Sequence, residues 1–246
     1  MSKGANSGIG YATVKVLAEA DANHHIIMTG RNQEALDTAK KEIEANGIKG
    51  KLSTITLDVT KEDSVRTAAV QVEKEFGRLD VLVNNAGLSD NSLPKEWSFK
   101  QKLDQILTTN VTGPAIVALA FRPLLIKAGD AKSIYITSGL GSLSNCSNPE
   151  SRHYHSKWTA YRTSKSALNM WALQDFKEST PEGVKVFTFC PGLVRSRLRG
   201  PEEEFVSAGG NAGDPAVSGE SILQIIKGER DEDVGQFIHK DGVYPW

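Results

Sequence analysis

The sequence has few of the features that mark several large classes of protein. It contains only two cysteines, Cys146 and Cys190, which stand far apart and in no metal-binding spacing. This count argues against a disulfide scaffold and fits a reducing compartment. The longest apolar run is far shorter than a membrane span, and the first residues contain no apolar signal-peptide stretch. We therefore expect a soluble cytoplasmic protein with no membrane partner.

Neither sign of charge is in excess. The 246 residues include 29 Lys and Arg and 30 Asp and Glu, which gives a net charge of −1. This balance provides no strong attraction to nucleic acid. Hydrophobic residues make up 39% and charged residues 24%, ordinary values that exclude a disordered chain. Because no linker, repeat or low-complexity tract is visible, we expect a single domain over residues 1–246.

Apolar runs typical of buried strands recur along the chain, and segments with helical periodicity separate them. Most of these runs are nearly continuous, as in parallel strands covered on both faces. They lie at residues 26–28, 52–57, 79–83, 133–137, 184–189 and 236–238. The alternation predicts an α/β fold of the Rossmann type, a doubly wound parallel sheet with helices on both faces. Residues 201–214 are rich in Glu and Gly, which predicts a mobile loop.

A glycine-rich turn stands near the start of the chain, Gly4-Ala5-Asn6-Ser7-Gly8-Ile9-Gly10. The apolar stripe that follows it predicts a helix. Glycines permit a tight turn and close backbone approach, and the free N–H groups of a helix N-terminus favour a diphosphate. A glycine-rich turn without a ligand is the alternative, because short glycine patterns are common.

Such a turn normally follows an apolar strand in the middle of the sheet, but only Met1, Ser2 and Lys3 precede Gly4. We therefore expect the first strand to be missing and the chain to be truncated at its N-terminus.

Tyr161 and Lys165 stand at positions i and i+4, which places a phenol and an ammonium on one face of a helix. An adjacent ammonium favours the phenolate and lowers the pKa of the phenol from about 10. Tyr161 could then donate a proton to a carbonyl oxygen. For an isolated pair, a core tyrosine beside a solvated lysine would be the better interpretation.

The pair is accompanied by other polar motifs. Ser138 and the segment Asn84-Asn85-Ala86-Gly87 end predicted strands, where side chains face the ligand crevice of an α/β sheet. Asn110 stands inside a helical segment, and Pro191-Gly192 follows another strand. In this combination and order, the sequence resembles the short-chain dehydrogenase/reductase family over essentially the whole chain. In character it resembles fungal, NADP-dependent, carbonyl-reductase-like members most.

The resemblance implies roles for the catalytic residues. Tyr161 would be the general acid/base, and Lys165 would lower the pKa of Tyr161 and hold the nicotinamide ribose. Ser138 would hydrogen-bond the substrate oxygen. Asn110 would anchor a water relay behind Lys165.

The resemblance also implies a set of cofactor-binding residues. Asn85 to Gly87 would flank the adenosine, Asp58 would meet the adenine ring, and Val194 and Ser196 would contact the nicotinamide amide. The family usually has Thr where Ser196 stands, and Ser keeps the hydroxyl. It also usually has Thr where Lys3 stands, directly before the first glycine of the expected phosphate cradle. The full expected set is Gly4, Gly8, Ile9, Gly10, Arg31, Asp58, Val59, Asn85, Ala86, Gly87, Tyr161, Lys165, Val194 and Ser196.

The 23 residues that separate Ser138 from Tyr161 indicate an insertion at residues 143–158, beside the expected site. His153 and His155 lie in it, but no further ligands accompany them, and zinc sites need three or four. We expect no metal, and read the insertion as a substrate-facing wall or a surface loop. Cys190 is interpreted as a packing residue.

The cofactor is predicted from the end of the second strand. A carboxylate there would bind the ribose 2′-hydroxyl of NAD, but Gly30 occupies the position and Arg31 follows. Arginine pairs well with a 2′-phosphate, which favours NADP(H). A surface arginine with no ligand is the alternative.

The main hypothesis is an NADP(H)-dependent oxidoreductase that interconverts a carbonyl compound and an alcohol. Two others stay open: an inactive or non-catalytic cofactor-binding product, and a dehydratase or epimerase on the same scaffold. The expected partner is a small, apolar or aromatic carbonyl or alcohol substrate, and the family implies a homo-oligomer.

Overall fold

The computed structural model describes residues 1–246, except for the side chains of residues 2 and 3. A single eight-stranded sheet runs through it in the order β3-β2-β1-β4-β5-β6-β7-β8. All neighbouring strands are parallel except β7 and β8. The strands are β1 (Ser2–Lys3), β2 (His25–Gly30), β3 (Lys51–Thr56), β4 (Val81–Asn84), β5 (Ala131–Ile136), β6 (Val184–Cys190), β7 (Phe237–His239) and β8 (Gly242–Val243). The predicted doubly wound parallel sheet is confirmed.

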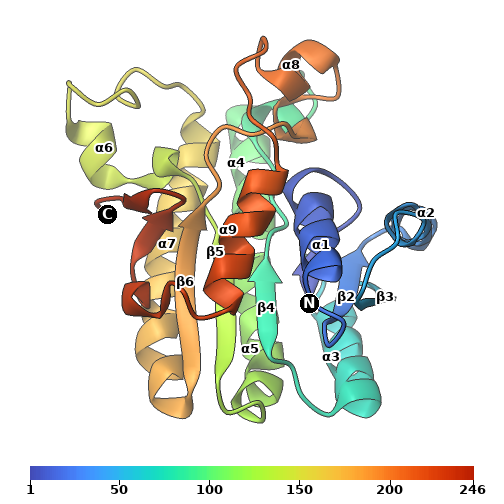
Figure 1. Ribbon diagram of the computed structural model, residues 1–246. Coiled ribbons are helices and arrows are strands. Elements are labelled where there is room, and N and C mark those ends of the chain that lie inside the picture. The colour runs from blue at the N-terminus through green and yellow to red at the C-terminus, as the bar shows by residue number, and fades with distance from the viewer.

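Helices cover both faces of this sheet (Figure 1). They are α1 (Gly8–Ala20), α2 (Gln33–Glu44), α3 (Glu62–Phe76), α4 (Phe99–Leu107), a π-helical turn (Thr108–Thr112), α5 (Gly113–Ile126), α6 (Leu143–Ser147), α7 (Thr159–Ser179), α8 (Glu203–Ser207) and α9 (Ala216–Ile226). Short 3-10 turns lie at Asp90–Ser92, Gly139–Gly141, Thr180–Glu182, Arg197–Arg199 and Asp231–Asp233. Helices α1, α2 and α9 pack on one face, and α3, α5 and α7 on the other.

The first strand is present as two residues rather than being absent. Ser2 and Lys3 pair with Met28 and Thr29 of β2, and Ser2 also pairs with Val83 of β4. Met1 extends this contact, because its carbonyl accepts a hydrogen bond of 2.9 Å from the Val83 amide. Beyond Met1, a cavity of about 420 Å³ lies between the amino-terminal ends of β2 and β4.

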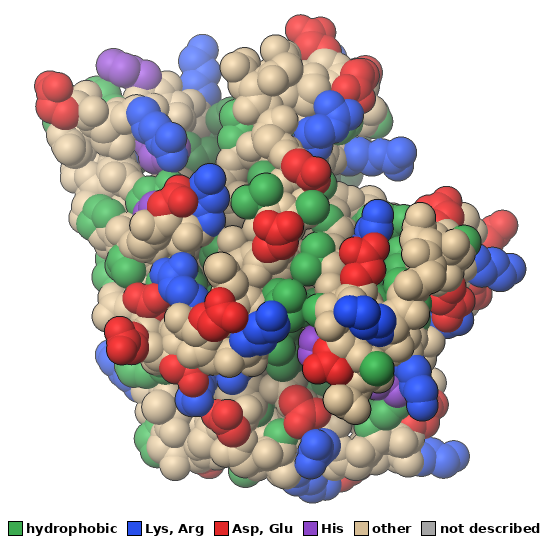
Figure 2. Space-filling model, viewed as in Figure 1, with side chains coloured by type: hydrophobic (Ala, Val, Ile, Leu, Met, Phe, Trp, Pro, Cys, Tyr) green, Lys and Arg blue, Asp and Glu red, His purple; other side chains and the backbone are tan. Residues whose placement is uncertain are grey.

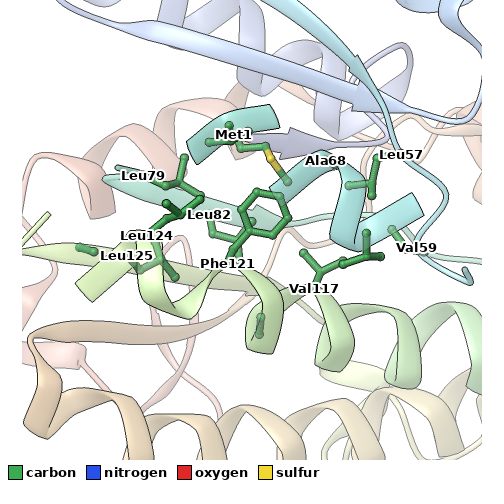
Figure 3. Packing of buried hydrophobic residues seen from close by; sticks show 14 of the residues in the cluster. Met1, Leu57, Val59, Ala68, Leu79, Leu82, Val117, Phe121, Leu124 and Leu125 are labelled. Atoms are coloured by element: carbon green, nitrogen blue, oxygen red, sulfur yellow. The ribbon is translucent and has the colours of Figure 1, made fainter. Parts of the chain in front are cut away.

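The core beneath the sheet includes the side chain of Met1, which is 7% exposed. Figure 3 shows it beside the ring of Phe121 from α5, with Leu82 and Leu124 nearby. Burial of side chains of this size stabilises a fold by about 1.5–3 kcal/mol each. Met1 thus forms part of the core between the sheet and the helices α3 and α5.

A buried polar cluster joins α5, β5 and α7. Asp175 is 3% exposed and accepts from Arg122 at 2.8 Å and from the Tyr135 hydroxyl at 2.7 Å. The Ser179 hydroxyl donates to the same carboxylate at 2.8 Å. A carboxylate buried so deeply is tolerated only because these donors satisfy it.

Residues 99–126 are long and apolar enough to cross a membrane, judged by length and composition alone. Here Val117, Phe121 and Leu125 of this stretch are buried in the core against the sheet. On the face shown in Figure 2, basic side chains (Lys and Arg) and acidic side chains (Asp and Glu) are interspersed.

The segment 201–214, predicted to be a loop, contains the short helix α8. Arg199 holds this helix by donating to the carbonyls of Phe205 and Val206, each at 2.8 Å. The glycines that suggested a loop follow the helix rather than interrupt it.

Candidate active site

A long cleft lies over the carboxyl ends of the strands. Its central part is a cavity of about 390 Å³, lined by the glycine turn, the end of β4, Ser138, Tyr161 and Lys165. A smaller cavity of about 230 Å³ adjoins it and shares Gly4, Arg31 and Gly87 with it. Ligands of open α/β sheets bind in this position, where the strand order reverses. Here the reversal falls at β1 and β4.

The glycine turn is built for close approach to a ligand. Gly8 begins α1 with φ +53°, in the left-handed region that favours glycine. A Cβ on Gly10 would lie 2.3 Å from the Gly4 carbonyl oxygen, so no larger residue fits there. Ser7, the N-cap residue of α1, makes no side-chain capping bond. The N–H groups of the first turn are therefore available for an anionic group.

Arg31 lies at the far end of the cleft, exposed, and lines both cavities. Gly30 packs against Leu36, and Asn6 lies nearby, so there is no acidic side chain at the end of β2. Asp58 and Val59 line the smaller cavity. Burial alone would raise the pKa of Asp58, but hydrogen bonds from Thr60 and the charge of Arg31 lower it below its usual value. This end of the cleft therefore carries one positive charge, on Arg31, and one negative charge, on Asp58.

Tyr161 and Lys165 lie on one face of α7, as their spacing predicts. Both are buried, and the Lys165 Nζ lies 5.6 Å from the centre of the Tyr161 ring. The same Nζ donates to the Ile136 carbonyl at 2.8 Å, which fixes it at the end of β5. Ser138, two residues further along, makes a side-chain hydrogen bond with Tyr161. The three side chains therefore converge at one end of the cleft.

The ionisation of this group differs from the expectation. Burial raises the pKa of Tyr161, Cys190 raises it further, and the Ser138 hydrogen bond and Arg199 lower it only in part. Burial lowers the pKa of Lys165 to about 8. Tyr161 is thus a protonated phenol, the form that donates a proton.

Asn110 lies in the π-helical turn, a feature often found at functional sites. Its amide accepts from the Leu88 amide at 2.7 Å and donates to the Leu88 carbonyl and to Ser164 Oγ. A Cβ on Gly87 would meet both Asn110 Oδ1 and Lys165 Nζ, at 3.5 and 3.7 Å. Asn110 therefore lies behind Lys165 but does not line the cleft.

Most of the predicted cofactor residues line the cleft. Gly4, Gly8, Ile9, Asn85, Ala86, Gly87, Val194 and Ser196 lie around its central part. Gly10 does not line it and acts through the tight packing of the turn. The substitution of Lys3 for Thr concerns a side chain outside the described part of the structure.

A third cavity, of about 410 Å³, is lined by Ser138 and Tyr161 but not by Arg31. Its walls come from the insertion, from Leu193, Leu198 and Arg199, and from Tyr244. Cys190 lines it, with its sulfur accepting from the Gly139 amide at 3.1 Å, and burial raises the pKa of this thiol. Among the residues whose side chains are described, no group of three or more His, Cys, Asp and Glu is placed to hold a metal.

The sequence predicted pocket walls from residues 143–158 and 193–214, which include Arg197 and Arg199, but it gave no role to Asn6 or Tyr244, which also line these cavities. Asn6 stands inside the glycine turn, so its position could have been noticed. Tyr244 comes 83 residues after Tyr161 and carries no local signal.

Comparison with known proteins identifies the family. The model of the family described as short chain dehydrogenase matches residues 3–206, and the chain belongs to this short-chain dehydrogenase/reductase family. It is 31% identical to the short-chain dehydrogenase/reductase tropE of Talaromyces stipitatus, over 97% of this chain and 94% of that protein. It is 32% identical to the short-chain dehydrogenase/reductase eupG of a Phoma species, over 99% and 95%.

Solved structures agree with the fungal relatives. An NADPH-bound carbonyl reductase from chicken fatty liver superposes with a TM-score of 0.81 and 26% identity, over all of this chain and 97% of that one. The carbonyl reductase Sniffer of D. melanogaster superposes with a TM-score of 0.77 and 27% identity, over 99% and 97%. The chain is therefore an oxidoreductase of this family, whose fold binds a nicotinamide cofactor.

Proposed function

We propose that this protein is an NADP(H)-dependent carbonyl reductase that converts an aldehyde or ketone to an alcohol. The observation that carries the proposal is the meeting of Tyr161, Ser138 and Lys165 at one end of a cleft whose other end holds Arg31. Two structural relatives, the chicken enzyme and a metagenomic oxidoreductase at 26% identity, were solved with NADPH or NADP.

The residues of the cleft fit a dinucleotide phosphate. The turn at Gly10 leaves room only for backbone, and the first turn of α1 offers unpaired N–H groups. Arg31 would pair with the 2′-phosphate through charge-assisted hydrogen bonds. When bound, the nicotinamide supplies the hydride that reaches the carbonyl carbon.

The protein's own residues stabilise and then neutralise the negative charge that develops on the carbonyl oxygen. The Ser138 hydroxyl donates a hydrogen bond to this oxygen, and the Tyr161 hydroxyl transfers its proton to it as the C–O bond becomes single. The Lys165 ammonium stabilises the phenolate that is left, and solvent then returns a proton to Tyr161. The carbonyl compound gains one hydride and one proton in total. In the reverse direction, Tyr161 removes the proton of the alcohol.

The test is the Tyr161→Phe variant, which keeps the ring and removes the proton donor. We expect NADPH-dependent turnover to fall by about 10²–10⁴-fold, while NADPH affinity, measured by fluorescence titration, changes little. The melting temperature serves as the control for folding. A folded variant with near-normal turnover would overturn the proposed role of Tyr161.

A further inference from the structure

The third cavity has an outer wall made by two segments that are distant in the sequence, the insertion 143–158 and the tail 237–246. The hydroxyl of Ser142 donates to the Pro245 carbonyl at 2.7 Å, and the Ser144 amide donates to the Trp246 carbonyl at 2.9 Å. Phe237 stacks on Trp246, with the ring centres 5.5 Å apart. In Figure 1 the tail lies beside α6, at the same edge of the molecule. These contacts fix the segment from Phe237 to Trp246, which contains Tyr244.

The Tyr244 ring lies next to the 3-10 turn Gly139–Gly141, which follows Ser138. A Cβ added to Gly139, the residue after Ser138, would come within 3.2 Å of the Tyr244 ring and 3.3 Å of His153 Nε2. The Tyr244 ring also packs against His239, with the ring centres 4.3 Å apart. The phenol is therefore held at the wall of the cavity that contains Ser138 and Tyr161.

Arg152 is held by this wall and lines the same cavity. Its Nη2 donates to the Tyr244 hydroxyl at 3.1 Å, and its Nε donates to His153 Nε2 at 3.3 Å. Burial, together with the charges of Arg152 and Arg162, lowers the pKa of His153, so this imidazole is neutral and can accept the bond. The guanidinium is thus oriented by two neutral side chains.

No carboxylate neutralises this arginine. Among the described side chains, no Asp or Glu forms an ion pair with Arg152, and none lines the third cavity. Arg199 adds a second positive charge, but its Nε and Nη2 already donate to the backbone carbonyls of Val194, Phe205 and Val206. Arg199 is left with the N–H groups of Nη1 alone, whereas Arg152 keeps N–H groups on both Nη1 and Nη2, the pair that a carboxylate can bridge.

Part of the remaining wall is apolar and aromatic. Leu140, Leu193, Leu198 and Trp158 face the same space. Trp158 has φ +78°, in the left-handed region that a bulky residue rarely adopts. Strain of this kind persists where the surroundings over-determine it, often in ligand-binding walls. The cavity therefore combines an apolar part of its wall with the positive charges of Arg152 and Arg199.

From this arrangement, and resting on the proposed reductase activity, we infer that the substrate is an apolar or aromatic carbonyl compound that carries a carboxylate, which Arg152 binds. Guanidinium and carboxylate match in a two-bonded geometry, and the Tyr244 contact orients the fork. The carbonyl of the same molecule would lie at Ser138 and Tyr161. Arg152 is thus a specificity-determining residue rather than a catalytic one.

The experiment compares two aldehydes of similar size, 4-formylbenzoate and 4-methylbenzaldehyde, with NADPH as the reductant. We expect the wild-type protein to have a higher kcat/KM for 4-formylbenzoate. Arg152→Ala should reduce this preference about tenfold, mainly through KM, since one charge-assisted contact of about 1.4 kcal/mol is a factor of ten. Arg152→Lys should retain part of the preference, and Lys157→Ala, an exposed change in the same insertion, is the matched control.

A binding measurement separates this inference from the proposed function. Calorimetry with the NADPH-saturated protein compares benzoate with benzamide, neither of which is an aldehyde or ketone. Benzoate binding that Arg152→Ala weakens supports the inference even if neither aldehyde is reduced, and in that case the proposed function fails alone. Equal binding of benzoate and benzamide, or benzoate binding that does not respond to Arg152→Ala, overturns the inference. Reduction of both aldehydes with no charge preference overturns it too and leaves the reductase activity intact.

Discussion

We propose that Arg31, which follows the end of β2, decides between NADPH and NADH. It lines the cleft next to Asn6 and Gly30, where a carboxylate would exclude a 2′-phosphate. We expect Arg31→Ala to raise the KM for NADPH by about ten- to a hundredfold, the equivalent of 1.5–3 kcal/mol for a charged hydrogen bond. The KM for NADH should change much less. Initial rates with both cofactors measure this, and equal increases would remove Arg31 from the 2′-phosphate site.

Lys165 gives the reaction a pH limit. Its pKa is lowered by burial from 10.5 to about 8, so its charge is lost as the pH rises through this value. We expect kcat/KM for reduction to fall about tenfold per pH unit above pH 8, because the phenolate of Tyr161 loses its stabilising ammonium. A profile that is flat to pH 10 would contradict this.

The predicted fall in kcat/KM above pH 8 cannot come from a loss of folding stability caused by Lys165. The folded protein binds the Lys165 proton more weakly than the unfolded chain does, so between pH 8 and about 10.5 the unfolded state holds more protons. Lys165 therefore makes the folded state more stable as the pH rises through this window. Melting temperatures across the same pH range are the control.

The sequence predicted the residues whose positions follow from local geometry. Tyr161 and Lys165 share a face because they are four residues apart on a helix, and Ser138 reaches the cleft because it follows a strand. Arg152 and Tyr244 could not be paired in this way, because 92 residues separate them and only the folded chain brings them together. The protonation of Tyr161 also depends on burial, which spacing does not reveal.

At the scale of elements, the contact between the 3-10 turn Gly139–Gly141 and α7 sets the geometry of the catalytic group. A Cβ on Gly141 would lie 2.7 Å from Lys165 Cβ and 2.8 Å from Lys165 C, a backbone atom that cannot yield without moving the helix. We expect Gly141→Ala to shift α7 and to reduce turnover by about a hundredfold, the effect of a 1 Å misplacement.

The matched control for this change is Gly213→Ala, where the nearest atom, the Leu193 carbonyl oxygen, is 3.8 Å from the new Cβ. Turnover and circular dichroism are measured for both variants. Similar activity in the two would mean that α7 is not held by its contact with Gly141.

The element predictions succeeded where apolar runs are long. The six predicted runs correspond to β2 through β7, because a strand buried on both faces needs continuous apolar sequence. They failed for α8, for the antiparallel β8 and for the two residues of β1. These elements are too short for periodicity to distinguish them, and β1 depends on its pairing with β2 and β4.

At the scale of the whole molecule, the carboxylate of Asp175 ties α5, β5 and α7 together. Asp175→Ala would leave Arg122 and the Tyr135 hydroxyl without their buried partner. We expect a loss of about 3–5 kcal/mol in the free energy of unfolding, the usual cost of breaking a buried pair. Urea unfolding measures this loss.

The exposed pair Asp63–Arg66 is the control for that experiment. The Asp63 side chain is 87% exposed, and Asp63→Ala should cost less than about 1 kcal/mol. Equal losses for the two variants would show that the buried cluster has no special weight in stability.

The tail that holds Tyr244, residues 237–246, is synthesised after the residues that line the cleft. Translation proceeds from the N-terminus, so the glycine turn, Arg31, Ser138, Tyr161 and Lys165 all leave the ribosome before residues 237–246. The cleft that suits a dinucleotide is drawn wholly from the earlier part of the chain, whereas the wall around Arg152 needs the tail. A nascent chain thus acquires the residues of the cleft first, and gains the wall that we infer to select its substrate only after residues 237–246 are made.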